Sequence, residues 1–327
     1  MALYTPQYRM GAQGYMTSKA QAGLLVAATA TEDPSAVAGV TDLIGFVDNP
    51  SAQRNEGLEP VQTPGSMRVV THTAGQRTYS VNTRFLVGDG AFIAYAARDH
   101  ADPDKIGTVM GLPLRTYEWG ATSEFGADQA DAEQALDGLI NSLSIEYREG
   151  APLTSTVDIW PSVILDDDDG VVAQASYTPM TGPVLHWCHL QWLVGGVDYH
   201  SILSGCRFQI QNSLQRINVR RQIGAASSED KISRTAYAIK PGPEMLGLQP
   251  SWHDKLPKAL RRTGDWSTLT MLAEEPGSGA GRRYLQVAIA HNYLQQWARQ
   301  ASDARGPMTW NSDTLSYELT ITHGTTT

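Results

Sequence analysis

Residues 204–240 constrain the fold most, because two strand-like segments flank a run that is too polar for a core. Residues 206–211 alternate apolar Cys, Phe and Ile with Arg and Gln, which is typical of a strand with one buried face. Residues 232–239 alternate in the same way. The run 212–224 between them is rich in Asn, Gln and Arg. These segments predict an extended hairpin whose polar arm lies against water or against another subunit.

Composition indicates an ordinary folded protein. The chain has 327 residues, of which 41% are hydrophobic and 18% charged, and this length allows two domains. It contains no apolar run near the ~18 residues that a membrane helix needs. Residues 1–16 do not resemble a secretory signal, so we expect the protein to stay in the cytoplasm of the cell that makes it. Two cysteines, Cys188 and Cys206, are too few for a disulfide framework, and we expect reduced thiols.

Charge is distributed unevenly along the chain. Residues 1–205 contain 10 Lys and Arg against 24 Asp and Glu, whereas residues 206–327 contain 15 against 10. Opposite fields at two ends of a molecule favour head-to-tail contact between copies, although an acidic half also serves solubility alone.

Period-two alternation recurs along most of the chain and predicts a mainly β fold. Hairpins are expected between residues 67–73 and 77–87 and between residues 143–147 and 154–160. Further strands are expected at residues 43–47, 114–119, 185–193, 266–272, 284–290 and 315–321. Helices are expected at residues 17–30 and 252–260, residues 125–137 suit a surface helix or a loop, and residues 91–98 suit a helix or a strand.

Three short matches between the halves indicate a duplicated β domain. They relate residues 77–79 to 234–237, residues 49–55 to 212–218, and residues 141–146 to 311–318. They occur in the same order and at nearly the same offset. An acidic run and a linker-like segment near residue 170 then divide the chain into predicted domains 1–170 and 171–327.

A one-sided strand, a polar arm, an Arg- and aromatic-bearing return strand and a final alternating strand together resemble the tail tube proteins of long-tailed, siphovirus-like bacteriophages. The likeness lies in residues 208–224, 232–239 and 315–322, with weaker echoes at 46–62, 77–87 and 143–159. The resemblance implies tandem β-sandwich domains with long hairpin arms and short helices, a fold shared with contractile-tail and type VI secretion tubes.

Two such units per chain depart from the single-domain pattern of most of that family. The resemblance therefore implies a homo-oligomer in which three chains form a pseudo-hexameric ring, with inner sheets joined into a β-barrel lumen and rings stacked helically. Double-stranded DNA would pass through this channel of the virion tail during ejection, and the tape measure and tail terminator proteins would be partners. The arm residues expected to contact a neighbouring subunit are Asn49, Gln53, Arg54, Asn212, Gln215, Arg216, Arg220 and Arg221.

Candidate chemical sites favour structural interpretations. A strand containing His186, Cys188 and His189 would point these side chains to different faces, whereas a helix would bring His186 and His189 together. Residues 166–169 fail the spacing of a calcium loop, and the glycine-rich residues 277–281 precede a strand, unlike a phosphate-binding loop. We expect a mechanical role with no cofactor, no metal and no catalytic residue.

Two alternatives stay open. A distal tail or baseplate protein of a phage would form one ring and no filament. A cytosolic two-domain β enzyme or ligand-binding protein would have a site near His186 and His189. An arginine patch also suits phosphate contacts, although pairing with acidic loops of adjacent subunits fits the acidic chain better. Its residues are Arg216, Arg220, Arg221, Arg261 and Arg262.

Overall fold

A computed structural model describes most of the chain, and the prediction of a mainly β fold is confirmed. The described residues are 14–21, 40, 42–55, 58–62, 69–74, 78–88, 90–97, 114–121, 131–166, 171, 184–222, 235–240, 242–253, 260–261, 266, 268–277, 280–301 and 308–326.

Strands and short helices follow one another in two similar series. The first is β1 (Gly14–Ala20), β2 (Asp42–Leu43), β3 (Phe46–Asn55), β4 (Leu58–Gln62), β5 (Val69–Ala74), β6 (Thr78–Leu86), α2 (Ala91–Ala94), β7 (Arg115–Ala121), β8 (Asp131–Arg148), β9 (Thr154–Trp160) and β10 (Val163–Leu165). The second is η3 (Trp187–His189), β11 (Leu190–Val194), β12 (Val197–Asp198), η4 (His200–Ile202), β13 (Leu203–Gln211), β14 (Gln215–Gln222), β15 (Thr235–Lys240), β16 (Met245–Trp252), β17 (Leu269–Glu274), β18 (Arg283–Ala301) and β19 (Met308–Thr325).

The two series have the same strand order, and we name them the first repeat (β1–β10) and the second repeat (β11–β19). Pairing runs β3-β6-β9-β8-β7-β1-β2 in the first repeat and β13-β16-β19-β18-β17-β11-β12 in the second. The hairpin β4–β5 follows β3, and the hairpin β14–β15 follows β13. We name these hairpins the first arm and the second arm. All of these pairings are antiparallel, so each repeat is built from the same set of neighbours.

Strand register also repeats, which makes coincidence an inadequate explanation. The ladder row through Ala52, Val81 and Ile159 corresponds to the row through Phe208, Leu248 and Thr314. Ile159 pairs with Ile140 on β8, and Thr314 pairs with Leu294 on β18. A one-residue irregularity follows each partner, at position 141 in β8 and at position 295 in β18. A bulge is a specific structural feature, and its recurrence fixes which positions correspond.

This register corrects the three sequence matches, although duplication itself is evident. Tyr79 lies on the core strand β6, whereas Tyr237 lies on the arm strand β15. Asn141 lies on β8, whose counterpart is β18, whereas Asn311 lies on β19. Short polar motifs recur by chance in β proteins, because alternation constrains the face of a residue but not its identity. The pairing of strands is what identifies equivalent positions.

The repeats are joined through one antiparallel pairing among the described strands, between β8 and β13. As a result, strands of both repeats belong to one sheet. The largest cluster of buried side chains also crosses the junction and contains both Leu143 and Phe208. Buried side chains of both repeats therefore belong to one cluster, and the division into two domains near residue 170 stays a prediction.

Several local predictions were wrong because tertiary pairing overrode local pattern. Residues 17–20 belong to β1 and not to a helix, since β1 is held between β2 and β7. The expected hairpin of residues 67–73 and 77–87 is absent: β5 pairs with β4, and β6 pairs with β3 and β9. Residues 131–137 begin β8. The expected hairpin of residues 143–147 and 154–160 is confirmed as β8–β9.

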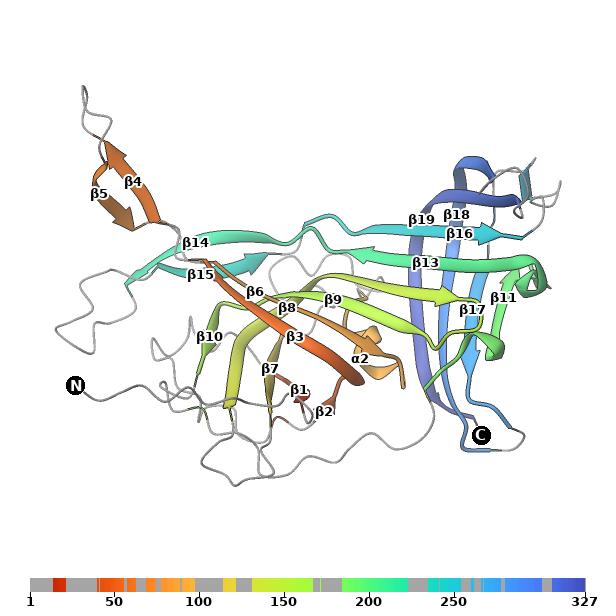
Figure 1. Ribbon diagram of the computed structural model, residues 1–327, viewed down its shortest axis with the longest axis horizontal. Coiled ribbons are helices and arrows are strands. Elements are labelled where there is room, and N and C mark those ends of the chain that lie inside the picture. The colour runs from red at the N-terminus through yellow and green to blue at the C-terminus, as the bar shows by residue number, and fades with distance from the viewer. Residues whose placement is uncertain are drawn as a thin grey trace.

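Both arms extend toward the same end of the molecule, and the first arm projects furthest from the body (Figure 1). Strands β13 and β16 run lengthwise beside β8 and β9, and β17, β18 and β19 lie at the end of the molecule opposite the arms. Within the described residues no helix has the length and apolar character needed to cross a bilayer.

Candidate assembly surface

The junction between β8 and β13 shows how one repeat joins another. Its seven residue pairs run from Gly205 opposite Arg148 to Gln211 opposite Ser142. On one face Phe208 packs opposite Ile145, and both are fully buried. Along residues 205–211 the edge of β13 is paired with a neighbouring strand, which removes an edge that would invite uncontrolled pairing.

The other face of this sheet is polar and crosses both repeats. Glu146, Arg207 and Gln249 are exposed and lie in one row across β8, β13 and β16. Arg84 and Thr156 are exposed partners on β6 and β9. These exposed side chains include charges of both signs and neutral polar groups.

Asn212 fastens the base of the second arm to the first repeat. Its side-chain amide donates to the carbonyl oxygens of Ala96 and Ile140, each at 3.0 Å, and its own N–H donates to the carbonyl of Asn141 at 2.8 Å. The side chain is fully buried within the chain. Asn212 thus makes a contact between repeats of one chain, and its expected contact with a neighbouring subunit stays a prediction.

Leu214 extends this contact. It covers Leu139 of β8 and Trp160 of β9, which are apolar side chains on the otherwise polar face of the sheet. It packs in a small cluster with Leu139 and Leu114, against which Trp160 also packs. Arg216 lies over the Trp160 ring at 4.0 Å from its centroid and donates to the Tyr79 carbonyl at 2.6 Å. Sequence reasoning singled out Arg216 for contact with another subunit but missed Leu214, whose signal was an apolar residue at the base of a polar arm.

The remaining predicted contact residues fall on the second arm and on β3, the strand that leads to the first arm. Gln53 and Arg54 are exposed on β3, and Gln215 is exposed at the start of β14. Asn49 lies in β3, and Arg220 and Arg221 lie in β14. Their contact with another subunit stays a prediction.

Each repeat also has one strand edge that, among the described strands, has no pairing of the kind seen between β8 and β13. In the described part of the chain β3 pairs with β6 alone, on one side. The second half of β18 pairs with β19, and no described strand lies on its other side. By the repeat register, residues 51–55 of β3 correspond to residues 207–211 of β13, and residues 296–301 of β18 correspond to residues 142–147 of β8.

An apolar patch lies on the polar face of the second repeat, and we name it the aromatic patch. Met245, Tyr293, Leu315 and Tyr317 are 57, 43, 44 and 53% exposed. Tyr293 pairs with Leu315 across β18 and β19, and its ring contacts Tyr317 edge-on at 6.4 Å. An open hollow beside the patch is lined by Met245, Gln295 and Leu315, among others.

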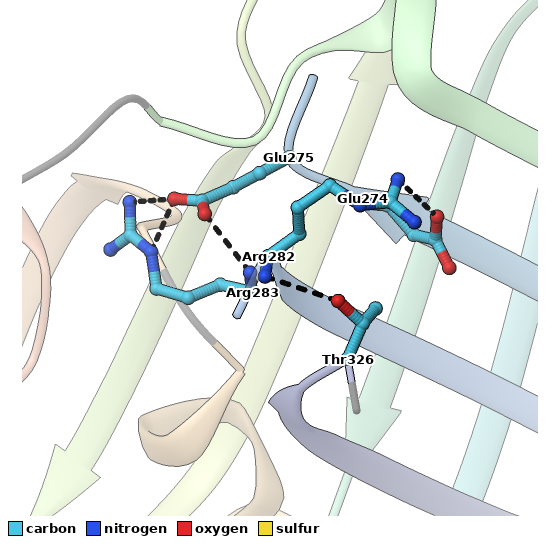
Figure 2. A network of polar contacts seen from close by, with 5 residues as sticks. All are labelled: Glu274, Glu275, Arg282, Arg283 and Thr326. Atoms are coloured by element: carbon cyan, nitrogen blue, oxygen red, sulfur yellow. Dashed lines mark hydrogen bonds and ion pairs between the residues drawn. The ribbon is translucent and has the colours of Figure 1, made fainter. Parts of the chain in front are cut away.

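A clasp of charged side chains closes the β17–β18 hairpin and binds the end of β19 (Figure 2). The Arg282 guanidinium donates to Glu274 at 3.0 Å, and the Arg283 guanidinium donates to Glu275. Burial raises the pKa of Glu275, but hydrogen bonds from Arg283 and its charge outweigh burial and hold that pKa below its ordinary value of 4.5. Arg282 also donates its N–H to the Thr326 hydroxyl at 3.1 Å. These arginines are engaged in holding strands together.

The histidine cluster is placed on a 3-10 turn and not on the expected strand. Trp187 is buried and packs against His200 at 4.8 Å between ring centroids. His186 accepts a hydrogen bond from the Cys188 N–H, and the His186 and His189 rings are 6.3 Å apart. Among the described residues no three His, Cys, Asp or Glu side chains are grouped as metal ligands. Cys188 is exposed and Cys206 is buried, and neither forms a disulfide.

Comparison with known proteins adds little. No protein-family model matches the chain. No curated protein matches it either. A solved structure of Hcp1 from Flavobacterium johnsoniae is similar over 42% of this chain and 96% of its own, with 11% identity and a TM-score of 0.21. A likeness at that level identifies neither fold nor function.

Proposed function

We propose that this chain is a structural subunit of a tube, of the kind formed by the major tail tube proteins of long-tailed bacteriophages, and that it has no catalytic centre. The observation that carries the proposal is the β8–β13 junction, where two copies of one β module are joined edge to edge within one chain. The chain then retains one matching edge of each kind, on β3 and on β18. Such complementary edges generate a closed ring when the rotation between modules closes.

In the proposed ring, β3 of one copy pairs with the second half of β18 of the next. Applying the in-chain register places Gln53 opposite Ala298 and Ala52 opposite Arg299, because Gln209 lies opposite Ser144 and Phe208 opposite Ile145. This contact is more polar than the in-chain junction. That difference suits a surface that is exposed to water before assembly.

Three chains supply six modules, which is the pseudo-hexameric ring that the sequence resemblance implies. The polar face of the joined sheets would line the channel, where mixed charges let DNA move without specific binding. The arms reach beyond the sheet and are suited to contact the next ring. In this proposal the protein resides in the virion tail.

Electron microscopy of the purified protein tests the proposal. Long hollow filaments built of rings with threefold symmetry and six modules are expected. Single rings that never stack would favour a distal tail or baseplate protein, which uses the same edges. Small globular particles at all concentrations, together with a monomer mass by light scattering, would refute a tube subunit and favour a binding protein or enzyme.

A further inference from the structure

The aromatic patch of the second repeat has a buried counterpart in the first. By the repeat register Tyr293 corresponds to Leu139, and Leu315 corresponds to Trp160. Leu139 is only 2% exposed because Leu214 of the second arm packs on it, whereas Tyr293 is 43% exposed. The same position on the same module is therefore covered in one repeat and uncovered in the other.

The covering residue has a counterpart as well. Leu214 stands three residues beyond the end of β13 at Gln211, and Leu58 stands three residues beyond the end of β3 at Asn55. In both cases the leucine lies at the base of the arm that follows. Apart from this position the arm bases differ, because Pro60 stands where Arg216 would.

The register of the proposed ring brings these counterparts together. In the chain Gln211 pairs with Ser142, so continuing the antiparallel register by three residues sets Leu214 against Leu139. If β3 of one copy pairs with β18 of the next in that register, Asn55 meets Gln296, and three further residues set Leu58 against Tyr293.

We propose that the aromatic patch of each copy is covered by Leu58, at the base of the first arm of a neighbouring copy. Leu58 takes the place there that Leu214 takes within the chain. Gln295 occupies the bulge position of Asn141, whose side-chain oxygen accepts from the Leu214 N–H at 3.1 Å, so its amide is positioned to accept from Leu58 in the same way. The arm base thereby selects this register, since a slip by one residue would turn Leu58 away from the patch.

This inference rests on the proposed ring, and disulfide trapping tests the two separately. In a Cys188→Ser background, Leu58→Cys chains are mixed with Tyr293→Cys chains and assembled under mild oxidation. A disulfide-linked dimer in the mixture, and none in either variant alone, is the expected result. A single chain with Leu214→Cys and Leu139→Cys is the matched control, because its internal disulfide shows that the same pair of positions permits the bond.

Rings that assemble in the mixture without a disulfide-linked dimer would overturn the inference and leave the ring proposal standing. A mixture that forms no rings at all would count against both. As a second measurement, Tyr293→Asp is expected to abolish ring formation without changing Tm, whereas Gln249→Asp on the same face assembles as the unmodified protein does. Normal assembly of Tyr293→Asp would also overturn the inference.

Discussion

The two repeats share a strand order and a register, yet they treat one equivalent surface differently. In the first repeat Leu139 and Trp160 are covered by Leu214 and Arg216 of the second arm. In the second repeat Tyr293 and Leu315 are exposed. The chain makes one contact between repeats internally, and in the proposed ring the edges of β3 and β18 make the equivalent contact between copies. Under that proposal the internal contact is a template for the external one.

Breaking the internal junction is expected to have the largest effect. Phe208 is fully buried opposite Ile145, so Phe208→Ala should lower the free energy of unfolding by about 3–5 kcal/mol, through lost burial and a residual cavity. Urea unfolding monitored by tryptophan fluorescence measures the change. Gln209→Ala, on the polar face of the same strand, is the control and should change it by less than about 0.5 kcal/mol. Equal effects would mean that the junction face is not packed.

A covered leucine of the first repeat and an exposed leucine of the second repeat offer a direct comparison. Leu139→Ala should lower the free energy of unfolding of the monomer by about 2–4 kcal/mol, since Leu139 is buried under Leu214. The matched change Leu315→Ala, at 44% exposure, should change it by less than about 0.5 kcal/mol. Thermal unfolding of unassembled protein measures both. A large loss for Leu315→Ala would show that the patch is covered within the monomer.

Removing the polar part of the internal contact should have an intermediate effect. Asn212→Ala leaves the carbonyls of Ala96 and Ile140 without this donor in a buried site, which should cost about 2 kcal/mol. Gln215→Ala, exposed three residues later, is the control and should leave stability unchanged within about 0.5 kcal/mol. Chemical unfolding of both variants decides the matter. An unchanged midpoint for Asn212→Ala would contradict the proposed fastening of the arm.

The clasp at the far end of the second repeat should contribute least. Glu275→Gln removes its pairing with Arg283 and should lower the free energy of unfolding by about 1 kcal/mol at neutral pH. Because the pKa of Glu275 is lower folded than unfolded, its stabilisation is present above pH 4.5 and is lost as pH falls through the folded pKa. The difference between the two proteins should therefore vanish in acid. A difference that persists at low pH would exclude this ionisation as its cause. Glu274→Gln, in a more exposed pair, is the control.

The alternation of residues 206–210 shows why the fold class was predictable from the sequence. A period of two assigns Phe208 to a buried face and Arg207 to an exposed one, whatever strand lies beside them. The same pattern cannot name the neighbour, because any strand with an apolar face satisfies it. The predicted hairpin of residues 67–73 and 77–87 was wrong for this reason: both segments are strands, but each found other partners.

The candidate surface divides in the same way. The sequence by itself determined the strands, their wet and dry faces and the polar arms, since these follow from local periodicity and side-chain polarity. Only the tertiary structure decided that β8 pairs with β13, that Asn212 is buried between repeats, and that Tyr293 stays exposed where Leu139 is covered. Those outcomes depend on register between segments far apart in the chain, and a shift of one residue would exchange every inner side chain for an outer one.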